Sequence, residues 1–192
     1  MSAPLPRLEE PAQRELLALA RRTLERYLAS GQKPDYTPAL EEIETPAAAF
    51  VTLRNGGELR GCIGHLASDR PLFRAVAECV ISAAVDDRRF RPVTHDELGE
   101  IDIEISVLTP FRRVAGPEEI EIGRHGLLLS RSGRRGLLLP QVAVEHGWDR
   151  ETFLGQTCRK AGLPTDAWRD STTVIEVFGA QVFSDRKLGP AT

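Results

Sequence analysis

The stretch from Pro71 to about Val85 is apolar around most of a helical circumference. Its polar side chains fall on a single line at helical spacing, formed by Arg74, Glu78 and Ser82. A helix with so narrow a polar stripe is usually buried on several sides. The sequence therefore predicts a central helix, and the rest of the chain must supply the layers that enclose it.

Those layers are predicted to be helices and strands in irregular order. Helical or extended patterns fall at residues 11–30, 47–53, 58–64, 101–108, 126–129, 136–139 and 173–183. Two pairs of these strands are typical of hairpins, and Thr94 to Glu97 fit a capping box before a short helix. We therefore expect an α+β fold with mixed or antiparallel sheets and flanking helices. The last run, with Gly179 as a candidate bulge, is expected to be one strand inside a sheet.

The turn of the first hairpin predicts its register. A three-residue loop at 55–57 would place Arg54 opposite Glu58, whereas a two-residue loop at 55–56 would place Leu53 opposite that glutamate. We favour the three-residue loop because it pairs opposite charges. In this register Arg60 and Cys62 lie on the same face of their strand.

Charge and cysteine content argue against several classes of protein. The chain carries 25 basic and 28 acidic side chains, a net charge of -3, so no long-range attraction to nucleic acid is expected. The three cysteines form no C-x-x-C pair, which argues for reduced thiols rather than a disulfide framework. No apolar run is long enough to span a membrane, and the N-terminus lacks a signal-peptide pattern. We expect a cytoplasmic protein.

The common catalytic signatures are absent from the sequence. It contains no G-x-G-x-x-G, no Walker-type phosphate loop, no H-E-x-x-H and no G-x-S-x-G. Cys62 and His65 would supply two metal ligands, which are fewer than a closed zinc site needs. We therefore expect neither a metal nor a cofactor.

The strongest candidate for chemistry is the segment Leu59-Arg60-Gly61-Cys62-Ile63-Gly64. Glycine is costly inside a strand, so the two glycines indicate a bulge or the close approach of a ligand or neighbouring backbone. With Arg60 beside it, Cys62 would favour the thiolate form, which is the reactive one. The alternative is that Cys62 is a small buried hydrophobe in a tightly packed strand, as free cysteines often are.

Other polar and aromatic residues have two interpretations each. Asp87 and Arg89 follow the central helix and would bind an anionic ligand or, as we favour, form an internal ion pair that fixes a loop. Glu104, on the polar face of its strand, is a general acid or base or a solvated carboxylate. Trp148 and Trp168 are packing anchors or, at a surface groove, part of a partner interface.

The hexapeptide at 59–64 resembles the signature of the AMMECR domain family. Further segments resemble that family's pattern in the same order, at residues 84–92, 103–108, 125–126, 137–143 and 147–148. The resemblance covers roughly residues 12–185, nearly the whole chain. It implies a single AMMECR domain with an α+β fold of two intertwined subdomains, flanked by flexible segments at 1–11 and 186–192.

The same resemblance implies that the protein works with others. Prokaryotic members are often encoded beside, or fused to, a MEMO-like protein and a radical SAM protein, so we expect a binding or adaptor component. The resemblance implies no catalytic activity and no active-site assignment. The alternative is an enzyme or redox component that uses Cys62 as a thiolate nucleophile with Arg60 assisting. The candidate catalytic residues are Cys62, Arg60 and Glu104, and the candidate ligand-binding residues are Gly61, Gly64, Asp87 and Arg89.

Overall fold

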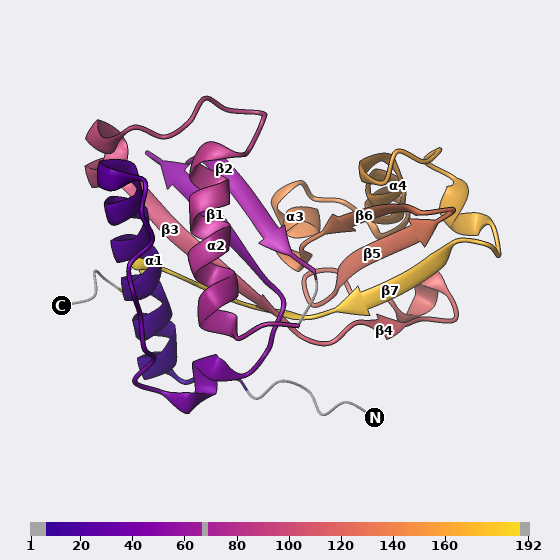
Figure 1. The fold of residues 1–192 in the computed structure, drawn as a ribbon. Coiled ribbons are helices and arrows are strands. Elements are labelled where there is room, and N and C mark those ends of the chain that lie inside the picture. The colour runs from indigo at the N-terminus through magenta and orange to yellow at the C-terminus, as the bar shows by residue number, and fades with distance from the viewer. Residues whose placement is uncertain (1–6, 67–68, 189–192) are drawn as a thin grey trace. The chain divides into compact units, whose positions relative to one another are not determined.

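The chain divides into two units, each built around its own four-stranded sheet. The computed structural model describes residues 7–66 and 69–188; its larger unit comprises 7–66, 69–108 and 181–188, and its smaller unit 109–180. Helices and sheets together make the fold α+β, as predicted (Figure 1). Of the segments expected to be flexible, 1–6 and 189–192 lie outside the described residues. Leu8 is buried, and its N–H donates to Gln181 Oε1 at 2.9 Å.

The larger unit is a sheet with two long helices packed on it. In spatial order its strands are β2 (Glu58–His65), β1 (Ala49–Asn55), β3 (Ile101–Leu108) and β8 (Ala180–Ser184). Helix α2 (Leu72–Val85) lies across β1 and β2, with α1 (Glu10–Ser30) beside it (Figure 1). Shorter helical segments are η1 (Glu41–Glu44), η2 (His95–Glu100) and α5 (Asp185–Leu188).

Helix α2 is the central helix that the sequence predicts. It contacts α1 as well as β1 and β2, so its wide apolar surface is buried against both layers. Pro71 lies at its N-cap, where a missing N–H costs no helical hydrogen bond. At the other end the Asp86 N–H donates to the Ser82 carbonyl at 2.8 Å. The chain that leaves α2 is tied back to it by the Val93 N–H, which donates to the Ala84 carbonyl at 2.8 Å.

The smaller unit has its own hydrophobic core. In spatial order its strands are β4 (Arg112–Arg113), β7 (Val174–Phe178), β5 (Gly126–Arg131) and β6 (Arg134–Leu138). Its helical segments are η3 (Pro117–Glu119), α3 (Pro140–Glu145), α4 (Arg150–Lys160) and η4 (Ala167–Arg169). The second predicted hairpin is confirmed as β5–β6. Asp149 caps α4 as its sequence suggests, accepting the Thr152 N–H at 2.8 Å.

The prediction of one strand over 173–183 is wrong, because Gly179 divides the run between two sheets. Before it, β7 lies inside the smaller unit's sheet; after it, β8 forms an edge of the larger unit's sheet. Thr109 stabilises the chain at the point where β7 ends and β8 begins. Its N–H donates to the Gly179 carbonyl at 2.9 Å, and its hydroxyl accepts the Gly179 N–H at 2.8 Å. A run of apolar residues shows that a strand is buried, and it carries no information on which sheet the strand joins.

The predicted register of the first hairpin is also wrong. The turn has two residues, Gly56 and Gly57, both at positive φ, and Asn55 lies opposite Glu58. Two consecutive residues at positive φ give the turn whose twist suits a tight hairpin, and this outweighs the charge pairing that we weighed. The register then shifts by one residue in β2, which leaves Arg60 as the extra residue of a bulge. Arg60 and Cys62 therefore do not form the regular i, i+2 pair that we expected.

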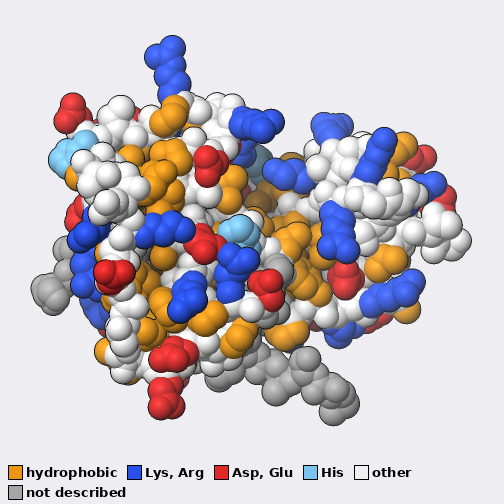
Figure 2. Space-filling model, in the orientation of Figure 1, with side chains coloured by type: hydrophobic (Ala, Val, Ile, Leu, Met, Phe, Trp, Pro, Cys, Tyr) orange, Lys and Arg blue, Asp and Glu red, His pale blue; other side chains and the backbone are white. Residues whose placement is uncertain are grey.

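The surface carries mixed charge. Figure 2 shows Lys and Arg side chains interspersed with acidic and uncharged ones on the face drawn. Within the part of the chain that the structure describes, no helix combines the length and apolar character needed to cross a bilayer.

Candidate functional site around strand β2

The two glycines of the hexapeptide allow close packing. A Cβ atom on Gly61 would lie 2.0 Å from the backbone oxygen of Ala83 in α2. At this distance the two atoms would overlap, so no side chain fits there. A Cβ atom on Gly64 would lie 2.2 Å from the ring of Phe50, which is its partner across β1. Packing within the larger unit thus explains both glycines without a ligand.

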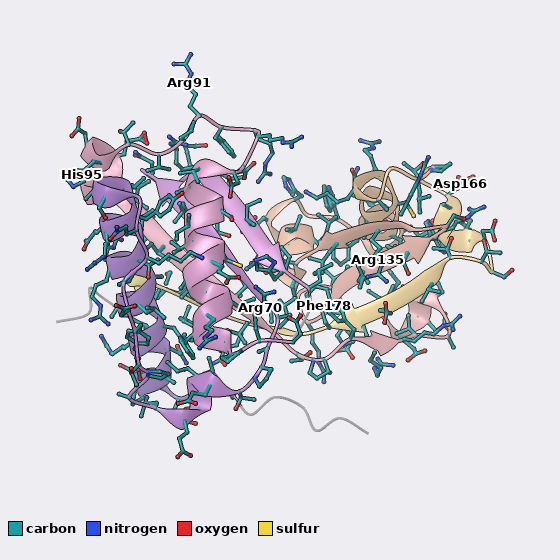
Figure 3. All side chains as sticks on the ribbon, in the orientation of Figure 1. Arg70, Arg91, His95, Arg135, Asp166 and Phe178 are labelled. Atoms are coloured by element: carbon teal, nitrogen blue, oxygen red, sulfur yellow. The ribbon has the colours of Figure 1, made fainter. Side chains whose placement is uncertain are left out.

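Arg60 fastens the segment that follows α2. Its guanidinium forms a bidentate pair with Glu97, with Nε and Nη2 each 3.0 Å from a carboxylate oxygen. It also donates to the carbonyls of Arg91 at 2.7 Å and Pro92 at 3.2 Å. Glu97 is therefore used by Arg60, and the predicted capping box is wrong, because the Thr94 side chain makes no cap bond. Figure 3 shows Arg91 at the outer end of this segment, with its own side chain pointing outward.

Asp87 holds the backbone of Cys62. Its buried carboxylate accepts the Cys62 N–H at 2.9 Å and the two donors of Arg89, Nε at 2.9 Å and Nη2 at 2.6 Å. The hydrogen bonds from Arg89 lower the pKa of Asp87 to about 2, and the backbone N–H of Cys62 adds to the effect. The internal ion pair that we favoured is thus present, and it satisfies an N–H of strand β2, which lies at the edge of its sheet.

The sulfur of Cys62 lies in a row of polar side chains. Thr52 is opposite Cys62 on one side and opposite Glu104 on the other, so the three residues line up across β2, β1 and β3. The Thr52 hydroxyl donates to the Cys62 sulfur at 3.3 Å. Gly61 faces α2, so strand alternation places Cys62 on the opposite face of the sheet. Cys62 is partly exposed, whereas Cys79 and Cys158 are fully buried, and burial raises the pKa of the Cys79 thiol to about 12.

A second surface lies in the smaller unit around Trp168. Its indole packs on the core and has the Arg169 guanidinium 4.2 Å from its ring centroid. Trp168 and Arg169 line two hollows of about 500 and 320 Å³. Asp166, labelled in Figure 3 beside η4, also lines the smaller hollow. Trp168 has two interpretations from the sequence, and the structure shows that it both packs on the core and lines these hollows.

Comparison with known proteins shows to which family this architecture belongs. The family model AMMECR1 matches residues 17–183. The chain belongs to the AMMECR1 family. Protein MK0488 of Methanopyrus kandleri is 46% identical over 181 residues, which cover 90% of this chain and 87% of that protein. A protein of Thermococcus onnurineus is 45% identical over 183 residues, 88% of each chain. The crystal structure of the uncharacterized protein PH0010 from Pyrococcus horikoshii aligns with a TM-score of 0.88 and 40% identity, covering 92% of this chain and 93% of that one.

The hexapeptide at 59–64 thus contains residues that make structural contacts and one candidate reactive group, Cys62. Of the residues singled out from the sequence, Cys62 and Glu104 lie in one row, to which the structure adds Thr52. Asp87 accepts the backbone N–H of Cys62 and pairs with Arg89, and the Arg60 guanidinium bonds elsewhere. Within residues 7–66 and 69–188, no three His, Cys, Asp or Glu side chains are placed to hold a metal ion. Thr52 could not be found from sequence because only the observed register pairs it with Cys62.

Proposed function

We propose that this AMMECR1-family protein is a binding or adaptor component that works with a MEMO-like protein and a radical SAM protein. The observation that carries the proposal is the groove around Trp168, where an indole and an arginine line two hollows. Tryptophan and arginine are the residues most enriched among those that dominate binding energy at interfaces. The hexapeptide supports the same function, because its arginine and both glycines already have partners within the fold.

Trp168→Ala is expected to remove partner binding. The tagged chain would be expressed together with the MEMO-like and radical SAM proteins of the same organism, and retention of either on the tag would be measured. The wild-type chain should retain a partner, and Trp168→Ala should retain at least about tenfold less, as expected for a central aromatic anchor.

Val144→Ser is the matched control for this loss. Val144 is 59% exposed in the same unit and does not line either hollow, so its variant should retain the partner fully. Melting curves of both variants would show whether each remains folded. Failure of the wild-type chain to retain either protein would contradict the proposed function.

A second candidate function is favoured by the hydrogen bond from Thr52 to the Cys62 sulfur. An O–H donor directed at sulfur stabilises a thiolate more than a thiol, so an enzyme or redox component that uses Cys62 as nucleophile remains a proposal. The assisting guanidinium would be Arg89 rather than Arg60. The pKa of Arg89 is raised above its usual range, first by its hydrogen bonds to Asp87 and in smaller part by Cys62.

This candidate predicts selective alkylation. In the native protein at neutral pH, iodoacetamide should modify Cys62 and leave Cys79 and Cys158 untouched, because both are 0% exposed. Peptide mass mapping would identify the modified thiol, and Thr52→Val should slow the reaction by removing the donor. If Cys62 reacts only after unfolding, together with the other two, the enzymatic candidate is wrong.

A further inference from the structure

The larger hollow beside Trp168 is lined by both apolar and charged side chains. Val114 and Ile175, both buried members of the smaller unit's core, line it together with the indole. Its volume of about 500 Å³ is ample for one large side chain and part of the backbone that carries it. Such a pocket favours an apolar or aromatic anchor.

The charges that line the larger hollow are not balanced. Arg169 pairs with Glu151 at 3.0 Å, and Asp170 pairs with Arg131 at 3.0 Å, so both already have opposite charges beside them. Arg113 also lines the hollow and is exposed. Across the described stretches of the chain, no hydrogen bond or ion pair engages its guanidinium. None joins it even to Glu176, which lies opposite Arg113 in β7. One arginine of the larger hollow thus retains its full capacity to bind an anion.

The smaller hollow has the opposite balance. Its lining includes Glu151 and Asp166 against one arginine, Arg169. A bound segment that passes over Trp168 from one hollow to the other therefore meets a positive group, Arg113, in the larger hollow. In the smaller hollow it meets an excess of negative charge. This arrangement favours an acidic residue only on the Arg113 side and disfavours one on the Asp166 side.

We infer that the groove binds an extended segment of the partner protein in which an apolar or aromatic side chain is adjacent to a carboxylate. The apolar side chain contacts Trp168 in the larger hollow, and the carboxylate pairs with Arg113. A guanidinium can bind a carboxylate through two parallel N–H donors, which supplies orientation as well as affinity. This inference rests on the proposed binding function and names the chemistry of the segment that the partner must present.

The test uses short blocked peptides and the fluorescence of Trp168. The chain has two tryptophans, so Trp148→Phe leaves Trp168 as its single indole emitter. The probe is a blocked pentapeptide that contains Lys-Phe-Asp, and its matched control contains Lys-Phe-Asn. The aspartate peptide should give a saturable change in emission, and the asparagine peptide should bind about tenfold more weakly, as expected when a charged hydrogen-bonded pair is lost.

Protein variants complete the test. Arg113→Gln should weaken the aspartate peptide by the same factor and remove the difference between the two peptides. Arg124→Gln should change nothing, because Arg124 is an exposed arginine of the same unit that pairs with Glu121 outside the groove. Equal binding of both peptides, an unchanged Arg113→Gln, or no saturable signal at millimolar peptide would overturn the inference.

Two further outcomes separate this inference from the proposed function. If the full-length partner binds through Trp168 but its affinity is unchanged by Arg113→Gln, the inference of a carboxylate in the bound segment is wrong and the proposed adaptor function stands. If the emission changes on raising the protein concentration alone, the occupant is a second copy of this chain, and the assignment to a partner segment is wrong.

Discussion

Gly61→Ala is expected to lower the free energy of unfolding of the larger unit by about 3 kcal/mol or more, or to prevent folding. The added methyl group would lie 2.0 Å from the Ala83 oxygen. That atom belongs to the backbone of α2, so the overlap is relieved only if the central helix moves away from β2. Because α2 also packs on α1 and β1, such a movement disturbs most of the core of the unit.

Two glycine variants calibrate this prediction. Gly99→Ala should change the free energy of unfolding by less than about 0.5 kcal/mol, because a Cβ atom there meets nothing within 4 Å. Gly64→Ala should fall between the two, since the Phe50 ring that it would meet belongs to a side chain that can turn. Urea denaturation of the three variants measures the differences. A Gly61→Ala protein as stable as Gly99→Ala would contradict close packing against α2 as the reason for this glycine.

Asp87→Asn is expected to cost about 2 kcal/mol at neutral pH, with a characteristic pH dependence. The pKa of Asp87 is lowered to about 2 by Arg89 in the folded chain, from an unfolded value of about 3.9. A lowered folded-state pKa means that the unfolded chain binds the proton more readily. The contribution of Asp87 is therefore complete above about pH 5 and is lost as the pH falls through about 3.9 towards 2 and below.

The measurement is the free energy of unfolding of wild type and Asp87→Asn between about pH 2 and pH 7. The difference between them should be constant near neutrality and should shrink at acid pH. Asp96→Asn is the control, because Asp96 is exposed and its replacement should leave the wild-type pH profile unchanged. A difference that persists unchanged at pH 2 would contradict the ionised Asp87–Arg89 pair as its source.

The sequence was sufficient to predict the elements whose signals are local. The apolar circumference of α2, the Asp149 cap and the β5–β6 hairpin all follow from residues that are close together in the sequence. The predictions that were wrong depended on which of several competing interactions or neighbouring strands the chain adopts. A glycine turn and a bulge at Arg60 compete with a charge pair, and only their relative energies decide the register. Likewise, nothing near Gly179 in the sequence shows that the strands before and after it join different sheets.

The candidate site was predictable to the same extent. The hexapeptide identified the strand and the family, and the acid–base pair after α2 indicated Asp87 with Arg89. The partners of Arg60 could not be predicted, because the Glu97 carboxylate and the Arg91 and Pro92 carbonyls lie more than 30 residues away in sequence. Arg113 could not be singled out as a binding residue for a related reason, because in the sequence it is only part of a small basic pair with Arg112. Its open guanidinium becomes a feature only when the chain folds around Trp168.

The most direct comparison is a calorimetric titration of the purified MEMO-like and radical SAM proteins against Cys62→Ser and Trp168→Ala. If the groove is the binding surface and the hexapeptide mainly shapes the fold, Cys62→Ser should bind a partner within about twofold of wild type, and Trp168→Ala should bind at least about tenfold more weakly. The opposite pattern, in which loss of the thiol abolishes binding and loss of the indole has no effect, would contradict this view of the protein.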